Sequence, residues 1–237
     1  MAKEPRDKDS KANGGSHTKE EQPQPTTLLL VRHALNDWVG DRLAGWTPDI
    51  HLNDKGRGQA EALAQRLADK PLAAVYSSPL ERAVETASII ARPHNLEVQI
   101  REGVGEVRYG KWTGQSLKEL AKEDAWRVVQ FYPSGAYFPD GEGIREMQAR
   151  AVAELDSIAA AHPSETVLVV SHADVIKASL AHYAGLHLDM FQRLVISPAS
   201  LSVVAFTDMG PRLVCLNDTA HIPPEETPNN QQAVEDS

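Results

Sequence analysis

Only one cysteine, Cys215, occurs in the 237-residue chain, and long apolar runs are missing altogether. A single thiol cannot form an internal disulfide, and metal sites built from paired Cys-x-x-Cys ligands are excluded. No apolar run comes near the roughly 18–20 residues that a membrane-spanning helix needs, and the N-terminus has no apolar signal-peptide core. We therefore expect a cytoplasmic protein that does not bind membranes.

The two ends of the chain lack the residues that build a hydrophobic core. Residues 1–26 contain no Leu, Ile, Val or aromatic residue, and residues 223–237 are rich in Pro, Glu, Asn and Gln. Such segments cannot bury enough apolar surface to offset the entropy lost on ordering. The composition predicts a disordered polar tail at 1–26, one domain at 27–222 and a disordered acidic tail at 223–237.

Positive charge is scarce as well. The net charge is −9, of which the C-terminal tail supplies four negative charges, while residues 1–26 hold five bases and five acids. The domain therefore carries about −5, which is not typical of a protein that binds nucleic acids or anionic membranes. We expect a small molecule as the partner of this domain.

The apolar residues form short runs that alternate with segments of helical period, a pattern typical of βα units around a mostly parallel sheet. The fold class predicted is therefore α/β, with helices flanking a central sheet. The candidate strands are Leu28–Val31, Ala73–Tyr76, Val98–Ile100, Val167–Val170, Leu201–Phe206 and Leu213–Leu216.

Four helices are predicted from apolar spacing and from their start signals. One follows a cap at Asn53 or Asp54, and a second begins at Ser78-Pro79-Leu80-Glu81, which has the form of a capping box with proline at the first helical position. A third runs from Ile144 to about Ile158. A fourth opens after His172 and runs to about Gly185.

Cationic and imidazole side chains follow three of the predicted strands. Arg32 and His33 end the first strand, Arg82 lies one turn into the helix after the second, and His172 follows a later one. Ligands of open α/β sheets bind beyond the carboxyl ends of the strands. Because guanidinium groups bind phosphate oxygens in a bidentate manner, these junctions predict a phosphate site.

An ordered set of motifs resembles the histidine phosphatase superfamily, branch 1, also called phosphoglycerate mutase-like. The resemblance covers nearly all of the domain. Its motifs are VRHALNDW, LAGW, HLNDKGRGQA, YSSPLERAVETA, GEVRYGKWTG, FPDGEG, VLVVSHAD and LNDTAHI. The implied fold is a three-layer sandwich whose mostly parallel central sheet is flanked by helices.

The resemblance also implies roles for individual residues. His33 would be the nucleophile that accepts the phosphoryl group, Glu106 the proton donor, and Arg32, Arg82 and His172 the pocket that holds the phosphoryl oxygens. Asn36 and Gly45 would complete the substrate-binding set. The implied reaction needs no metal ion and no cofactor. Glu142 and His221 match the motifs too, and we expect a structural role for Glu142.

The sequence departs from the family pattern at three positions. Ala34 and Ala173 replace glycines that follow the two histidines, and Val39 replaces an asparagine of the mutase-like members. If position 34 requires a positive φ, alanine there would be strained by roughly 1 kcal/mol or more.

Three functions remain open at this point. The first is a phosphomonoester hydrolase that acts on a small phosphorylated metabolite. The second is a cofactor-dependent phosphoglycerate mutase, which the scarcity of bases between Gly114 and Gly141 disfavours because only Lys118, Lys122 and Arg127 occur there. The third is a phosphate-binding module without catalysis, which Ala34 and Ala173 would suit.

Aromatic residues concentrate in two segments outside the main strands and helices, and two explanations stay open. The residues pack in a satellite cluster under long loops, or they wall a pocket. For the segment from Trp126 to Phe138 we also consider a lid that favours apolar or ring-containing leaving groups. The nine residues are Trp38, Trp46, Tyr109, Trp112, Trp126, Phe131, Tyr132, Tyr137 and Phe138.

Overall fold

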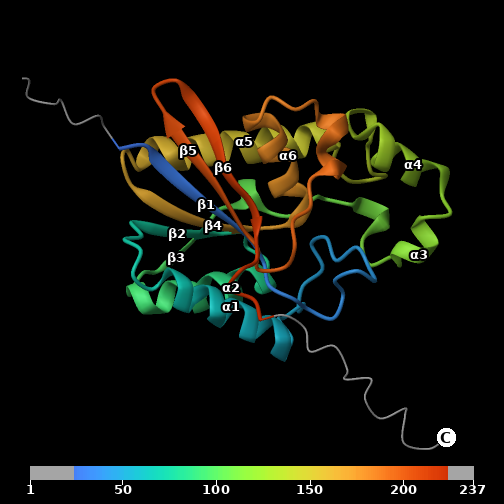
Figure 1. The fold of residues 1–237 in the computed structure, drawn as a ribbon. Helices are drawn as coiled ribbons and strands as arrows, with labels where there is room; N and C mark the ends of the chain where they lie inside the picture. The colour runs from blue at the N-terminus through green and yellow to red at the C-terminus, as the bar shows by residue number, and fades with distance from the viewer. Residues whose placement is uncertain (1–23, 224–237) are drawn as a thin grey trace, which may run out of the picture.

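A six-stranded sheet forms the centre of the structure, a computed structural model that describes residues 24–223 (Figure 1). The strand order is β3-β2-β4-β1-β5-β6. The first four strands are parallel to one another, and β5 is antiparallel to both of its neighbours, β1 and β6. The mostly parallel sheet is therefore confirmed. The strands are β1 (Thr26–Arg32), β2 (Ala74–Ser77), β3 (Val98–Ile100), β4 (Thr166–Ser171), β5 (Leu201–Thr207) and β6 (Gly210–Asp218).

All six predicted strands form. Five of them contain the predicted range, and β2 is displaced by one residue from the prediction of Ala73–Tyr76. Most of the two predicted tails, residues 1–23 and 224–237, lies outside the described residues. Among residues 24–223, no helix is long and apolar enough to cross a membrane.

Two long helices cover each face of the sheet, which gives the predicted three layers (Figure 1). Successive residues of β1 point to opposite faces. Leu29 and Val31 pack in the cluster that includes residues of α1 and α2, while Leu28 and Leu30 pack with residues of α5 and α6. The helices are α1 (Asp54–Leu67), α2 (Glu81–Ala91), α5 (Ile144–Ala161) and α6 (Ala173–Tyr183).

The predicted helix starts are right at α1 and wrong in detail at α2. The Asn53 side chain accepts a hydrogen bond from the Gly56 amide and caps α1. At α2 the cap position is Leu80, not Ser78, and no side chain caps the helix, so the predicted capping box does not form. The Ser78 hydroxyl instead contacts the His172 imidazole, 2.8 Å away. This tertiary contact places the serine side chain against His172 and not at the start of α2.

Short helices and loops between β3 and α5 form a separate lobe at one end of the molecule (Figure 1). The rings of Tyr109 and Trp112 both pack edge-to-face against Phe138, so an aromatic cluster does lie under these loops. The elements of the lobe are η3 (Gly110–Trp112), α3 (Leu117–Leu120), α4 (Asp124–Phe131) and η4 (Pro133–Gly135), whereas η2 (Glu102–Val104) packs against α5 in the main core. Elsewhere lie η1 (Arg92–His94) and η5 (Leu188–Arg193), which packs against α6.

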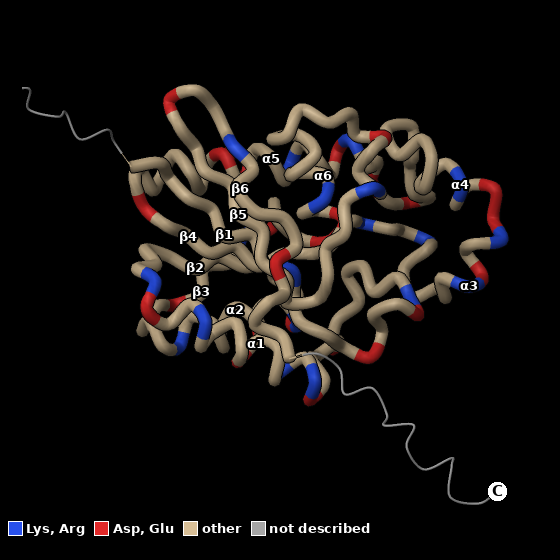
Figure 2. The backbone as a smooth tube through the Cα atoms, viewed as in Figure 1, with Lys and Arg blue, Asp and Glu red and all other residues tan. Residues whose placement is uncertain are grey.

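Charged residues of both signs are interspersed over the helices and loops of the described chain. Figure 2 shows Lys and Arg in blue alternating with Asp and Glu in red, from the α1 side of the sheet to the α3–α4 lobe. Several of them form exposed pairs, such as Lys122 with Glu119 and Lys111 with Asp140. Such exposed pairs contribute about 0–1 kcal/mol each to stability. The candidate functional site is the cavity described next.

Candidate active site

The sheet brings the two predicted histidines side by side. Arg32 at the end of β1 is the register partner of Ser171 at the end of β4, and the His33 amide donates to the Ser171 carbonyl at 2.9 Å. The next residue after each strand therefore meets its counterpart, and the His33 and His172 ring centroids lie 5.2 Å apart. Parallel neighbours thus create the site at the edge where ligands of α/β sheets bind.

His33 is held as a neutral imidazole with one nitrogen free. Its side chain is buried, and Nδ1 lies 2.8 Å from the Ala34 carbonyl oxygen. Because a carbonyl only accepts hydrogen bonds, Nδ1 carries the proton and Nε2 keeps its lone pair. Burial, followed by the charges of Arg82 and Arg32, lowers the pKa of His33 well below its ordinary value. A neutral imidazole with a free Nε2 can act as a nucleophile.

Two arginines face the same space, Arg82 buried and Arg32 partly buried. The Arg82 side chain is completely buried, and Nη2 donates to the Gly45 carbonyl at 2.8 Å. Arg32 donates from Nη1 to the Ile196 carbonyl at 2.7 Å. Burial lowers the pKa of both guanidinium groups, and the Glu106 carboxyl opposes that effect.

Several buried donors around His33 have no hydrogen-bond partner among the described residues. They are Arg32 Nε, Arg82 Nε, Arg82 Nη1 and Asn36 Nδ2. A buried polar group without a partner is costly, and proteins retain such groups mainly where a ligand or a catalytic role requires them. All three side chains line one cavity, so the geometry suits a ligand with several acceptor oxygens.

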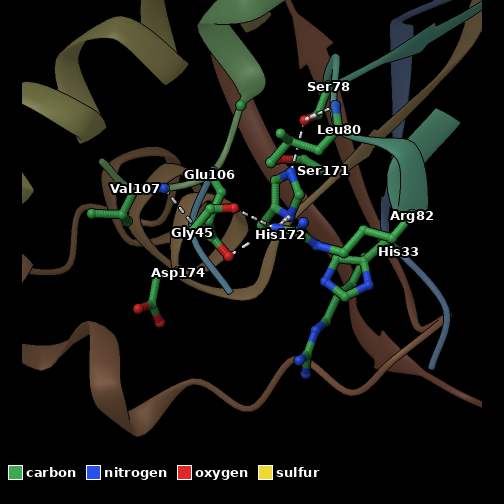
Figure 3. A network of polar contacts seen from close by, with 12 residues as sticks. His33, Gly45, Ser78, Leu80, Arg82, Glu106, Val107, Ser171, His172 and Asp174 are labelled. Carbon is green, nitrogen blue, oxygen red and sulfur yellow. Dashed lines mark hydrogen bonds and ion pairs between the residues drawn. The ribbon is translucent and has the colours of Figure 1, made fainter. Parts of the chain in front are cut away.

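Glu106 lies on the same side of the His33–His172 pair as Asp174 (Figure 3). One of its carboxyl oxygens accepts from the Val107 amide at 2.9 Å, and the other is 3.7 Å from His172 Nδ1. Burial first, and then the negative charge of Asp174, raises the pKa of Glu106 to about 7. The group is therefore protonated in a large fraction of molecules near neutral pH and suits a proton donor.

His172 stands behind Arg82 and Glu106 rather than at the cavity surface. Its side chain is fully buried, with Nε2 2.8 Å from Ser78 Oγ and Nδ1 3.4 Å from Arg82 Nη2. Burial and the charge of Arg82 lower the pKa of His172 well below its ordinary value. Direct contact of His172 with phosphoryl oxygens stays a prediction.

The cavity in front of His33 has a volume of about 420 Å³, within the range of small-molecule sites. Its floor consists of Arg32, His33, Asn36, Arg82 and Glu106. We call its other lining residues the outer wall, which comes from the loop after β1, the α3–α4 lobe, α6 and the segment around η5. The outer-wall residues used below are Trp38, Val39, Arg42, Tyr109, Leu117, Trp126, Gln130, Asp174, Lys177 and Gln192.

Gly45 lies outside the cavity lining although it was predicted to bind substrate. Its carbonyl oxygen fixes Arg82, and its φ of +50° suits glycine. A Cβ atom there would lie 3.1 Å from the Tyr109 ring and 3.2 Å from Thr113 Oγ1. The geometry gives Gly45 a positioning contact, and its contact with substrate stays a prediction.

The strain considered for Ala34 does not occur. Ala34 is absent from the described non-glycine residues with positive φ, and its amide donates to Thr86 Oγ1 at 3.0 Å. Ala173 occupies the first turn of α6 without strain. Val39 lines the outer wall, while Asn36, three residues earlier, lies on the floor.

Sequence reasoning missed Arg42, which lines the cavity and pairs with Asp41, and two charged lining residues that contact each other, Asp174 and Lys177. Both lie on α6, one turn apart, and Asp174 is part of the VSHAD motif that follows β4. A negative charge in the first turn of a helix interacts favourably with the helix dipole, which is reason enough for an aspartate there. The motif therefore did not indicate that Asp174 lies at the cavity.

Arg150 is a further residue without an obvious signal in the sequence. From the middle of α5 it donates to the carbonyl oxygens of Gly103, Gly105 and Glu106 at 2.8–2.9 Å and forms two hydrogen bonds with Glu142. Glu142 also accepts from the Arg108 amide. Arg150 and Glu142 therefore hold the loop that carries Glu106, and Glu142 has the structural role expected for it.

His221 also has a structural contact. Its Nε2 lies 3.1 Å from the carbonyl oxygen of Ala199, a residue with φ of +56°. The Ala199 amide in turn approaches the carbonyl oxygens of Arg32 and His33 at 3.2 and 3.3 Å. His221 thus supports the turn that lies behind the end of β1.

The aromatic residues divide between the two explanations. Trp38, Tyr109 and Trp126 line the cavity, and Tyr109 is also part of the cluster with Trp112 and Phe138. Phe131, Tyr132 and Tyr137 are 55–77% exposed and do not line it. Within the segment considered as a lid, Trp126 is the one aromatic residue at the cavity.

Comparison with known proteins agrees with this geometry. A family model described as the histidine phosphatase superfamily (branch 1) matches residues 28–219. Phosphoserine phosphatase 1 of Hydrogenobacter thermophilus is 34% identical over 200 residues, which cover 82% of this chain and 93% of that protein.

Two solved structures share the fold. Bacillus stearothermophilus YhfR superposes with a TM-score of 0.76 at 31% identity and covers 84% of this chain and 100% of its own. A mutant phosphoserine phosphatase from Entamoeba histolytica, solved in complex with phosphoserine, has a TM-score of 0.75 at 28% identity with the same two coverages.

Proposed function

The chain belongs to the histidine phosphatase superfamily, branch 1, and on that premise we propose that it is a metal-independent phosphomonoesterase that forms a phosphohistidine. Its substrate in this proposal is a small phosphorylated metabolite. The observation that carries the proposal is the set of unpartnered donors on Arg32, Asn36 and Arg82 around the free Nε2 of His33.

In the first step, His33 Nε2 attacks the phosphorus atom, and the bond from phosphorus to the ester oxygen breaks. Charge on the transferring group is spread over its three equatorial oxygens. The guanidinium groups of Arg32 and Arg82, with the Asn36 amide, supply the positive charge and donors for these oxygens, which is the role a metal ion plays in other phosphatases.

Glu106 donates a proton to the leaving oxygen, which departs as an alcohol. In the second step Glu106, now a carboxylate, takes a proton from a water molecule that attacks the phosphohistidine. Inorganic phosphate leaves and His33 and Glu106 return to their starting states. A pKa of about 7 suits both steps because donor and acceptor forms are both populated near neutral pH.

Small phosphorylated metabolites as substrates are supported by the relatives. Relatives whose names state a substrate include the phosphoserine phosphatases of Hydrogenobacter thermophilus and Entamoeba histolytica. The cavity volume of about 420 Å³ suits molecules of that size.

The mutase alternative is less well supported by the cavity. Lys118, Lys122 and Arg127, the bases available in that segment, are not among the lining residues, although Leu117 and Trp126 beside them are. Lys122 instead pairs with Glu119 at 2.7 Å. Interconversion of 2- and 3-phosphoglycerate in the presence of the bisphosphate primer would favour the mutase, and phosphate release alone favours the phosphatase.

The proposal is tested by phosphate release from an aryl phosphate and a panel of phosphorylated metabolites in EDTA, for the wild type and His33→Ala. We expect the variant to lose about 10⁴-fold or more in kcat, since removal of a nucleophile has effects of this order or larger. Quenching with a denaturant at alkaline pH during turnover should trap a phosphoenzyme that is stable in base and labile in acid, in the wild type alone. Undiminished turnover in His33→Ala, or loss of wild-type activity in EDTA, would contradict the proposal.

A further inference from the structure

Two opposite charges of the outer wall, Asp174 and Lys177, make no contact with the transferred phosphoryl group in the proposed mechanism, and Asp174 acts on the reaction through the pKa of Glu106. The Lys177 ammonium lies 3.3 Å from Asp174 Oδ1 and 3.1 Å from Gln192 Oε1. The Tyr109 hydroxyl donates to Asp174 Oδ2 at 3.2 Å. Both charged side chains are largely buried, with 19% and 16% exposed for Asp174 and Lys177. The pair is held in place at the cavity rather than free in solvent.

The floor of the cavity already balances the charge of the phosphoryl group. A phosphomonoester carries close to two negative charges at neutral pH, and Arg32 and Arg82 offer two positive ones. Any further charge on the substrate therefore belongs to the leaving group, which extends from the floor past Glu106 toward the outer wall. There it meets Asp174, which lies on the Glu106 side of the imidazoles (Figure 3).

The Asp174 carboxylate has capacity for another donor. An ionised carboxylate offers about four acceptor sites, and Tyr109 and Lys177 use two of them with long contacts. An ammonium group on the leaving group would add a charged donor to the remaining sites, whereas an extra negative charge would be repelled.

We propose that Asp174 is a specificity residue that favours phosphoesters whose leaving group carries an ammonium group over those whose leaving group carries negative charge alone. The inference rests on the proposed phosphatase function. Lys177 has three N–H donors, of which Asp174 and Gln192 engage two. The third can receive a carboxylate, so the favoured class comprises phosphoesters of amino alcohols and hydroxy amino acids.

The test compares two probes that differ at one group. O-phosphoserine and 3-phosphoglycerate share the phosphoester and the carboxylate, but the first has an ammonium group where the second has a hydroxyl. We expect the wild type to prefer O-phosphoserine in kcat/KM by about tenfold or more, the effect of one hydrogen bond to a charged group. In Asp174→Asn this ratio should fall about tenfold, whereas Asp174→Glu should retain the preference.

The ratio of the two probes cancels any effect of the variants on Glu106, because both probes need the same proton. Lys177→Gln is the matched control on the same helix: it should weaken both probes through their shared carboxylate without lowering the ratio. Thermal melting and turnover of an aryl phosphate establish that each variant is folded and active.

The outcomes separate the inference from the function on which it rests. A wild type that hydrolyses an aryl phosphate but shows a ratio near one, or an Asp174→Asn variant that keeps the wild-type ratio, would overturn the inference alone. Hydrolysis of the aryl phosphate, but of neither O-phosphoserine nor 3-phosphoglycerate, would also overturn the inference alone. A wild type that releases phosphate from no compound would overturn the proposed function and the inference together.

Discussion

The floor of the cavity is built by side chains at or near the carboxyl ends of β1 and β2 and by Glu106 in the loop after η2, whereas much of its outer wall comes from loops and short helices. Floor residues such as His33 and Arg82 are 4% and 0% exposed. The outer-wall residues Trp126 and Gln130 of the α3–α4 lobe are half-buried. A packed sheet edge fixes reacting groups closely, and loops are where selectivity can vary.

The buried donors without partners on the floor also lower the stability of the fold, and favourable contacts elsewhere must offset this cost. Arg32 Nε and two Arg82 nitrogens are buried without partners among the described residues, and burial lowers the pKa of both arginines. The outer wall, in contrast, pairs its charges, as Asp174 does with Lys177. We infer that the floor is arranged for a bound anion and the outer wall for the rest of the substrate.

The largest difference between the two regions should appear with Arg82→Met. Loss of one preorganised cation should lower kcat/KM about 10²–10³-fold. Because an apolar side chain of similar volume relieves the cost of a buried charge, the free energy of unfolding should stay unchanged or increase. Phosphate-release kinetics and thermal melting, with Arg82→Lys as the charged control, measure both. Equal loss of activity and stability would contradict this account.

The pH profile sharpens the comparison at Glu106, which touches both regions. Its pKa of about 7 lies above the ordinary value, so the proton donor is lost as pH rises through 7, and kcat/KM for an alkyl phosphate should fall about tenfold per pH unit beyond it. Asp174→Asn removes a negative charge that raises this pKa, so the decline should begin at lower pH. Glu106→Gln should abolish it. A decline that keeps its position in Asp174→Asn would contradict this assignment.

Arg150→Met should have a smaller effect on activity and a clear one on stability. Its side chain holds Glu142 and three carbonyl groups of the Glu106 loop. Its loss leaves the largely buried Glu142 carboxylate without a counter-charge and removes a donor from each of those oxygens, although the Arg108 amide still donates to Glu142 and Trp46 to the Glu106 carbonyl. We expect a loss of about 2–3 kcal/mol in denaturant unfolding. A fall of about tenfold in kcat with little change in KM would show that Arg150 positions Glu106. The double variant Arg150→Met, Glu142→Gln should recover part of the stability.

The smallest effect is expected for Phe131→Ser on the exposed face of α4. Because the ring is 77% exposed and does not line the cavity, turnover of an aryl phosphate should change less than about twofold and stability by less than about 0.5 kcal/mol. Trp126→Ala, five residues earlier and at the cavity, should raise KM for the same compound. Similar effects in both variants would mean that the α3–α4 lobe acts as a whole, as the lid hypothesis requires.

The features that the sequence predicts are the strands, the long helices and the sheet edge, and those that it does not predict depend on contacts between different elements. The six strands, the four long helices and the meeting of Arg32, His33, Arg82 and His172 at one sheet edge were predictable, because apolar periodicity and βα order are local signals. The α2 capping box was wrong because Ser78 is drawn to His172, a residue 94 positions away. Arg150 gave no signal because most of its partners lie on other elements, and the position of Lys177 at the cavity depends on tertiary neighbours such as Gln192.

By itself the sequence determined the layers of the fold, the edge at which chemistry converges and the residue types available there. Tertiary structure alone decided which His33 nitrogen is free, which arginine donors lack partners, and how burial and Asp174 raise the pKa of Glu106. The physical reason is range. Periodicity and capping act over a few residues, whereas desolvation and charge–charge interactions depend on neighbours that only the folded chain brings together.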